Sequence, residues 1–182
     1  NLDKIFEFFQ NNPILNIVFL ILAVIGVLAT IYFYFKSVRK KEPTFSIRSI
    51  NLVKDKINKI KGLEIKYQEE KINNLSISKI AFYNNGKETI KTTDVASKDK
   101  IRIETNDENK ILDSDIIFEK NKANNFNLKL KKNIVEIDFD YFDYGEGIVI
   151  QVVHTGKSSQ DLTINGSIHG VKNFKEKSMD KS

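Results

Sequence analysis

The sequence predicts a mainly β protein in which a single transmembrane helix precedes an immunoglobulin-like β-sandwich. Two observations predict this class. No residue from Phe8 to Phe35 is charged, whereas charged residues make up 29% of the 182-residue chain. After Pro43, short runs of alternating apolar and polar residues recur between polar turns. Such runs are typical of the strands of a sandwich, and a small barrel is the alternative architecture.

The predicted helix comes first in the chain. Residues 14–35 are apolar or uncharged and would extend roughly 33 Å as an α-helix, enough to cross a hydrocarbon core of about 30 Å. Asn12 and Pro13 suit the N-cap and the first helical position, and Pro43 prevents continuation. The basic cluster follows the apolar run, which favours a retained anchor over a cleaved signal peptide. We expect an anchor at residues 13–41 after a short extracytoplasmic or interfacial segment at residues 1–12.

The basic residues after the helix predict its orientation. Lys36, Arg39, Lys40 and Lys41 follow the apolar run, and only Lys4 precedes it. Since Lys and Arg are retained on the cytoplasmic side, we expect a membrane protein with its N-terminus outside and its C-terminal domain in the cytoplasm. The same four side chains are predicted to contact anionic lipid, so the bilayer is an expected partner. The alternative is that they only determine topology.

Three small residues lie on one face of the predicted helix. Ala23, Gly26 and Thr30 are spaced three and four residues apart. Such a stripe allows two helix backbones to approach closely. It predicts a protein partner or a homo-oligomer formed through the membrane helix. The alternative is chance, because small residues are common in membrane helices.

The β domain is predicted at residues 44–172, with a flexible tail at residues 173–182. Apolar alternation places strands near 44–50, 63–67, 74–82, 101–103, 111–118, 126–130, 135–139, 148–153 and 162–168. In the third strand the alternation changes phase between Ile77 and Ile80, which predicts a bulge or a strand that changes sheets. Helical spacing predicts a short helix or ordered loop at residues 52–61.

Four runs resemble those of a known group of proteins: KIAFYNNGKETI (79–90), KILDSDI (110–116), FDYFDYGEGIVIQVVHTG (139–156) and GSIHGVK (166–172). On these runs the chain resembles an uncharacterised family of bacterial single-pass membrane proteins with a cytoplasmic β-sandwich. The resemblance covers nearly the whole chain. It implies the architecture and a bacterial lineage, so the expected membrane is the bacterial inner membrane, and it implies no catalytic residue.

The candidate contacts for a ligand or partner are Asp140, Asp143, Tyr144 and His154. Closely spaced carboxylates suit Ca²⁺ or Mg²⁺, but this spacing departs from an EF-hand loop, so we expect no metal. The alternative interpretation is a solvated strand face leading into a corner turn. For His154 it is a histidine at a strand end, bonded to the following turn.

Composition and motifs restrict the function. The chain has no cysteine, which excludes disulfides, thiolate zinc ligands and a cysteine nucleophile. It lacks a GxxxxGK loop, and neither histidine lies in a nucleophile motif, so we expect no enzyme and no cofactor. The basic residues lack a recognition helix or aromatic platform, so nucleic acid is not an expected partner.

Three functional hypotheses remain. The leading one is a noncatalytic binding protein tethered to the membrane, which recognises a protein or a small molecule. The second is a membrane effector of antiphage defence that oligomerises on a signal such as a cyclic nucleotide. The third is a structural subunit of a larger membrane complex.

Overall fold

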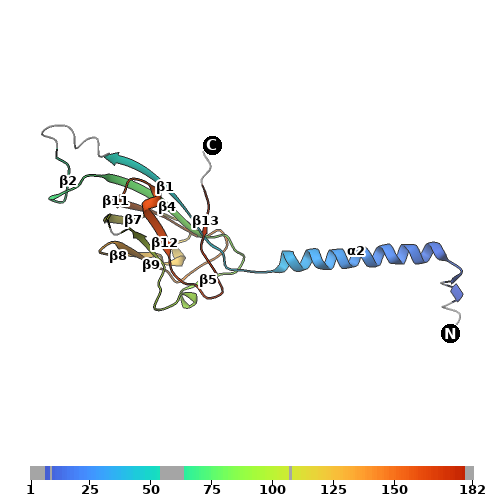
Figure 1. The fold of residues 1–182 in the computed structure, drawn as a ribbon. Coiled ribbons are helices and arrows are strands. Elements are labelled where there is room, and N and C mark those ends of the chain that lie inside the picture. The colour runs from blue at the N-terminus through green and yellow to red at the C-terminus, as the bar shows by residue number, and fades with distance from the viewer. Residues whose placement is uncertain (1–6, 9, 54–63, 107, 179–182) are drawn as a thin grey trace. The chain divides into compact units, whose positions relative to one another are not determined.

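The structure, a computed structural model, describes residues 7–8, 10–53, 64–106 and 108–178. The chain divides into two compact units, residues 1–39 and residues 40–182. The first contains a long apolar helix and the second contains the β-sheets (Figure 1). The predicted fold class, an N-terminal apolar helix followed by a mainly β domain, is confirmed.

Helix α2 spans Pro13–Ser37, and none of its residues is buried within the chain. It is long and apolar enough to cross a membrane. The backbone oxygen of Asn12 accepts the first helical hydrogen bonds, but its side chain donates to Phe8 O instead of capping the helix. Val38 leaves helical geometry with a ψ of 114°, so the helix ends four residues before the predicted boundary at Lys41.

The larger sheet has five strands in the order β13-β1-β4-β11-β7. These are β13 (Lys175–Glu176), β1 (Pro43–Val53), β4 (Leu75–Asn84), β11 (Gly147–His154) and β7 (Ile111–Glu119). All neighbours are antiparallel except β13, which pairs parallel with β1. The long central strands therefore place residues from three distant parts of the sequence in one register.

The second sheet has four antiparallel strands in the order β12-β6-β9-β8. They are β12 (Leu162–Asn165), β6 (Arg102–Thr105), β9 (Ile134–Asp138) and β8 (Asn127–Lys131). Two short pairs complete the domain: β10 (Tyr141–Phe142) with β5 (Ile90–Lys91), and β2 (Lys66–Tyr67) with β3 (Glu70–Lys71). Single 3₁₀ turns are η2 (Thr92–Asp94), η3 (Lys122–Asn124) and η4 (Ser159–Asp161).

One hydrophobic core joins the two sheets. Its buried members include Ile80, Ile148 and Ile150 from the larger sheet, and Ile103, Val135 and Ile164 from the smaller. An aromatic group closes one part of this core, with the ring of Phe142 within 5.5 Å of the rings of Phe82, Phe126 and Phe139 between centroids. All core residues lie between positions 45 and 174, so the β domain has what it needs to fold without the helix.

Strand β4 is continuous, so the predicted bulge or change of sheet is wrong. It pairs with β11 without a register shift along the whole of β11. The phase of the apolar residues changes because both faces of the strand change character along its length. The inner face runs Phe82, Ile80, Ser78, Ser76, and the outer face runs Lys79, Ile77, Leu75.

The described part of the predicted tail contains a short strand. Phe174 packs against the core, and Lys175–Glu176 form β13. The sequence pattern did not predict this strand because its residues are polar. The strand is held by the packing of Phe174 and by pairing with β1. Leu52 and Val53 extend β1, and the rest of the predicted helix at residues 52–61 lies outside the described residues, as does most of the predicted interfacial segment.

Candidate functional site

The polar end of the inner face is organised by His154, whose side chain is fully buried. Its Nδ1 accepts a hydrogen bond from the Gly156 N–H at 3.1 Å, so Nε2 carries the ring proton. Nε2 donates to Ser78 Oγ at 2.7 Å, and the hydroxyls of Ser78 and Ser49 on β1 are hydrogen-bonded to each other. The structure thus places His154 in the interior, as a strand-end histidine bonded to its turn.

Two further polar side chains complete this network. Ser76 Oγ donates to Gly156 O at 2.6 Å and accepts from Asn51 Nδ2 at 2.9 Å. These bonds join β1, β4 and the turn after β11. Internal hydrogen bonds therefore take the place of apolar packing at this end of the sheet, and among the described residues only Asn51 Oδ1 of this network is buried without a hydrogen-bond partner.

Protonation of His154 is expected to destabilise the β domain. Burial lowers its pKa below the usual value of 6.5, although Asp161 acts in the opposite direction. The unfolded chain binds the proton first, so stability is complete above pH 6.5 and falls as the pH decreases from 6.5 towards the folded pKa, by at most about 1.4 kcal/mol per pH unit. Urea unfolding of residues 40–182 at pH 7.5, 6.5 and 5.5 measures this loss.

Matched histidine variants identify the group. His154→Gln should remove this pH dependence, whereas His169→Gln, at the exposed second histidine, should retain it. An unchanged pH dependence in His154→Gln would assign the effect elsewhere.

The outer face of the same end of the sheet is apolar. Ile50 on β1 lies opposite Ile77 on β4, which lies opposite Val153 on β11. Ile50 is 58% exposed and Leu52 is 50% exposed. A sheet with one solvated face normally has its apolar residues inside and its polar residues outside. This end has the reverse arrangement, which the change of phase in β4 signalled in the sequence.

Charges are segregated across this surface, the outward side of β1, β4, β11 and β7, which we name the outer sheet face. One row of paired residues crosses it as Arg48, Lys79, Gln151 and Asp115. Asp113, also exposed, pairs with Val153 in the next row. Within the described residues, none of these four charged groups has an ion-pair partner. The face therefore has a basic side at β1 and β4 and an acidic side at β7.

The predicted loop contacts occupy a different region. Asp143 accepts a hydrogen bond from the Thr89 hydroxyl, and Asp140 accepts one from Asn125 at 3.3 Å. Tyr144 is 64% exposed beside them. The loop is shaped by Glu146, whose pKa is lowered by bonds from the Asp143 N–H and the Asn124 side chain. The structure therefore groups Asp140, Asp143 and Tyr144 near one turn, away from the buried His154.

The predicted lipid-binding residues divide between the two units. Lys36 lies in the last turn of α2 with its Nζ 5.6 Å from the ring centre of Tyr32, and Arg39 is exposed. Lys41 instead pairs with Asp94 at 2.8 Å, and its side chain is only 15% exposed. Bonding to Asp94 raises the pKa of Lys41. The β domain therefore uses Lys41 as a structural ion-pair partner.

Lys40 also pairs within the β domain, through the buried Glu42. Glu42 lies 2.9 Å from both Lys40 and Lys175 and accepts a hydrogen bond from Asn85 at 2.8 Å. The Asn85 bond, followed by those from Lys175 and Lys40, lowers the pKa of Glu42 to about 2. The segment just before β1 is thus fixed by the Glu42 carboxylate, which stays ionised at neutral pH.

The predicted helix stripe is exposed within its own unit. A Cβ at Gly26 would meet no atom within 4 Å, so this position is open to a neighbouring helix. The Thr30 hydroxyl donates to Gly26 O at 2.8 Å, so its polar group is satisfied inside the helix.

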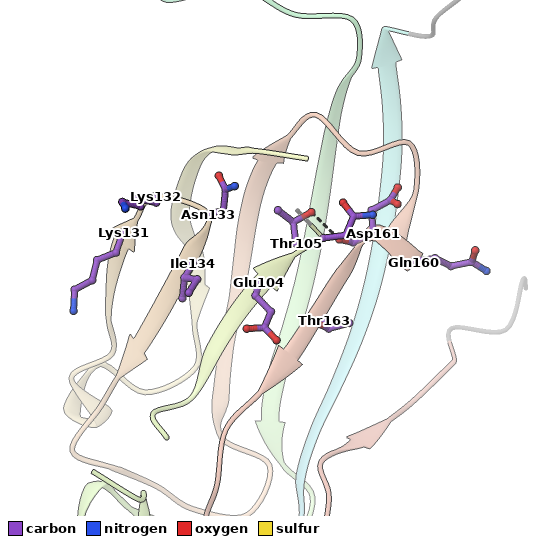
Figure 2. Close-up of a pocket in the computed structure, with 10 residues that line it drawn as sticks. Glu104, Thr105, Lys131, Lys132, Asn133, Ile134, Gln160, Asp161 and Thr163 are labelled. Carbon is purple, nitrogen blue, oxygen red and sulfur yellow. Dashed lines mark hydrogen bonds between the residues drawn. The ribbon is translucent and has the colours of Figure 1, made fainter. Parts of the chain in front are cut away.

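The second sheet has a hollow on its surface. It is an open groove of about 610 Å³ between the ends of β6, β9 and β12 (Figure 2). Its lining includes Thr105, which donates to Asp161 O at 2.9 Å, together with Lys131 and Lys132. None of the four predicted ligand contacts lines this groove. Among the described residues, no group of His and carboxylates is placed to hold a metal.

Comparison with family models, curated proteins and solved structures finds no match. The class of protein is therefore defined by its fold and its surface alone. It is a β-sandwich joined to an apolar helix, with an apolar and charge-segregated outer sheet face.

Proposed function

We propose that the protein is a membrane-anchored, noncatalytic binding protein whose β domain engages a partner through the outer sheet face. The observation that carries the proposal is the reversal at one end of the larger sheet, where buried hydroxyls and an imidazole face inward and isoleucines face outward. Apolar patches of this kind mark interaction surfaces. The apolar helix supports a membrane tether, and Lys36 and Arg39 support a cytoplasmic domain.

A noncatalytic role is supported by how the reactive groups are used. Both ring nitrogens of His154 are hydrogen-bonded in the interior. The loop acids Asp143 and Glu146 accept bonds that shape their own turn. These groups act in folding, which leaves the surface to provide recognition.

Cysteine labelling tests this function, because the natural chain contains no cysteine. The full chain with Ile77→Cys is compared with Thr163→Cys, which lies on the exposed side of the second sheet. In membranes of the producing cells, a maleimide should label the cysteine at position 77 several-fold more slowly than in detergent-solubilised, purified protein. The cysteine at position 163 should react equally in both. Equal labelling at position 77 would contradict the binding function.

A further inference from the structure

We infer that the partner covering the outer sheet face is a second copy of this chain. The two copies would pack their outer sheet faces together around a twofold axis that runs parallel to β4 and β11 and passes over the gap between them. This inference rests on the proposed function, because it names the occupant of the same surface. Three features of the face support self-pairing, and one opposes it, because the same axis places Ile50 of each copy opposite Asp113 of the other.

The first feature is charge. A twofold axis parallel to the strands places β1 of one copy opposite β7 of the other, and β4 opposite β11. The row Arg48, Lys79, Gln151, Asp115 of one copy then lies opposite the same row of the other copy, read in the reverse order. Arg48 of each copy meets Asp115 of the other, so two opposite-charge contacts form at symmetric positions. These groups have no ion-pair partner within the described part of one chain, so pairing breaks no existing bridge.

The second feature is side-chain size. The neighbouring row crosses the face as Ser46, Ala81, Val149 and Phe118. Its large residue, Phe118, is 56% exposed at the β7 side, and its small residues lie at the opposite side. Reversal of the row places each Phe118 ring over the half-buried Ala81 of the other copy and beside Ser46, which is already buried within its own chain. Large side chains therefore meet small ones, as packed sheet faces require.

The third feature is direction. Rotation about an axis parallel to the strands keeps the start of both β1 strands at the same end of the dimer. Two chains anchored in one membrane need this arrangement. Four strands about 4.8 Å apart, with roughly seven residues of about 3.3 Å each, cover on the order of 400 Å² in projection. This is about half the area per partner of a standard interface, so the dimer depends on concentration by the membrane.

Reversing the charge of Arg48 or Asp115 tests the inference, because only pairing between two copies of this chain predicts that the two variants rescue each other. Full chains are labelled at Thr163→Cys with donor or acceptor dyes and reconstituted in liposomes without other proteins. Energy transfer should exceed that expected for random distribution. Arg48→Glu alone places a glutamate against Asp115 of the other copy, and Asp115→Arg alone places two arginines together. Each should weaken self-association about tenfold or more.

A mixture of the two variants provides the decisive result. One copy with Arg48→Glu and one with Asp115→Arg bring opposite charges together at both symmetric contacts, so mixed liposomes should regain energy transfer. Failure of the mixture to recover, or unchanged transfer in the single variants, would overturn the inference. Both substitutions are at exposed positions, and an unchanged thermal unfolding profile confirms the fold. Gly26→Ile should leave transfer intact, and its loss would instead assign the association to the helix.

The two proposals fail differently. If position 77 is protected in cell membranes but the pure chain shows no specific transfer in liposomes, the surface binds another protein and only the second-copy inference is overturned. If position 77 is unprotected in cell membranes, the binding function itself is contradicted.

Discussion

The Asn84→Ala substitution is expected to lower the free energy of unfolding of the β domain by about 3–5 kcal/mol, because it leaves several buried backbone groups without partners at about 1–3 kcal/mol each. Asn84 is fully buried. Its Oδ1 accepts from the N–H groups of Gly86 at 2.9 Å and Glu42 at 3.3 Å. Its Nδ2 donates to Glu88 O at 2.7 Å and Phe142 O at 3.4 Å. One amide thus joins the chain entry, the turn after β4 and β10.

Urea unfolding of residues 40–182, followed by circular dichroism, measures this effect. Asn85→Ala is the matched control, since the adjacent side chain is exposed and its amide donates to Glu42. It should cost about 1 kcal/mol or less at pH 7. It should also raise the pKa of Glu42, whose contribution is complete above pH 4.5 and is lost as the pH falls towards 2. An Asn84→Ala domain as stable as the control would contradict the role of Asn84.

Two arginines in the apolar helix are expected to release the protein from the membrane. Ile21 and Ile25 are one turn apart near the middle of α2, and both are exposed. Each arginine at the centre of a membrane helix costs about 2.5–3.5 kcal/mol, so Ile21→Arg with Ile25→Arg costs about 5–7 kcal/mol. This is comparable with the favourable sum of roughly fifteen apolar residues at about 0.3–0.6 kcal/mol each. Most of the double variant should therefore leave the membrane fraction.

Carbonate extraction followed by immunoblotting of the pellet and supernatant provides the measurement. Ile21→Leu with Ile25→Leu is the control, because it keeps length and hydropathy and should stay in the pellet. Retention of the double arginine variant in the carbonate-resistant pellet would contradict insertion of the helix. The β domain of either variant should unfold at the same urea concentration, since its core contains no residue before position 45.

The sequence alone was sufficient for the helix and for most strands. An uncharged run of this length has few other uses, and its predicted limits differ from α2 by a few residues only at the basic end. Strands such as β9 and β11 were predicted correctly because their inner faces are apolar. In β9 the apolar residues alternate with polar ones, and in β11 apolar residues lie on both faces. Local periodicity reports burial correctly wherever the inner face stays apolar.

The same reasoning located β4 but misinterpreted the phase change within it, because periodicity identifies the apolar face and not the inner one. From Ser78 to Ser76 the inner face is polar, and only the positions of Ser49, Asn51 and His154 show that these hydroxyls have partners. Those partners come from strands distant in the sequence. A local pattern therefore could not distinguish an inverted face from a bulge.

What the sequence by itself determined is the class: an apolar helix followed by a mainly β domain, with basic residues between them in the chain. Only the tertiary structure decided how the polar and charged residues are used. It assigned Lys41 to an ion pair in the β domain, His154 to the interior and β13 to the edge of the larger sheet. It also brought Arg48, Lys79, Gln151 and Asp115 into one row. The physical reason is that strand pairing joins residues far apart in the chain, and the register that aligns them depends on every strand in the sheet.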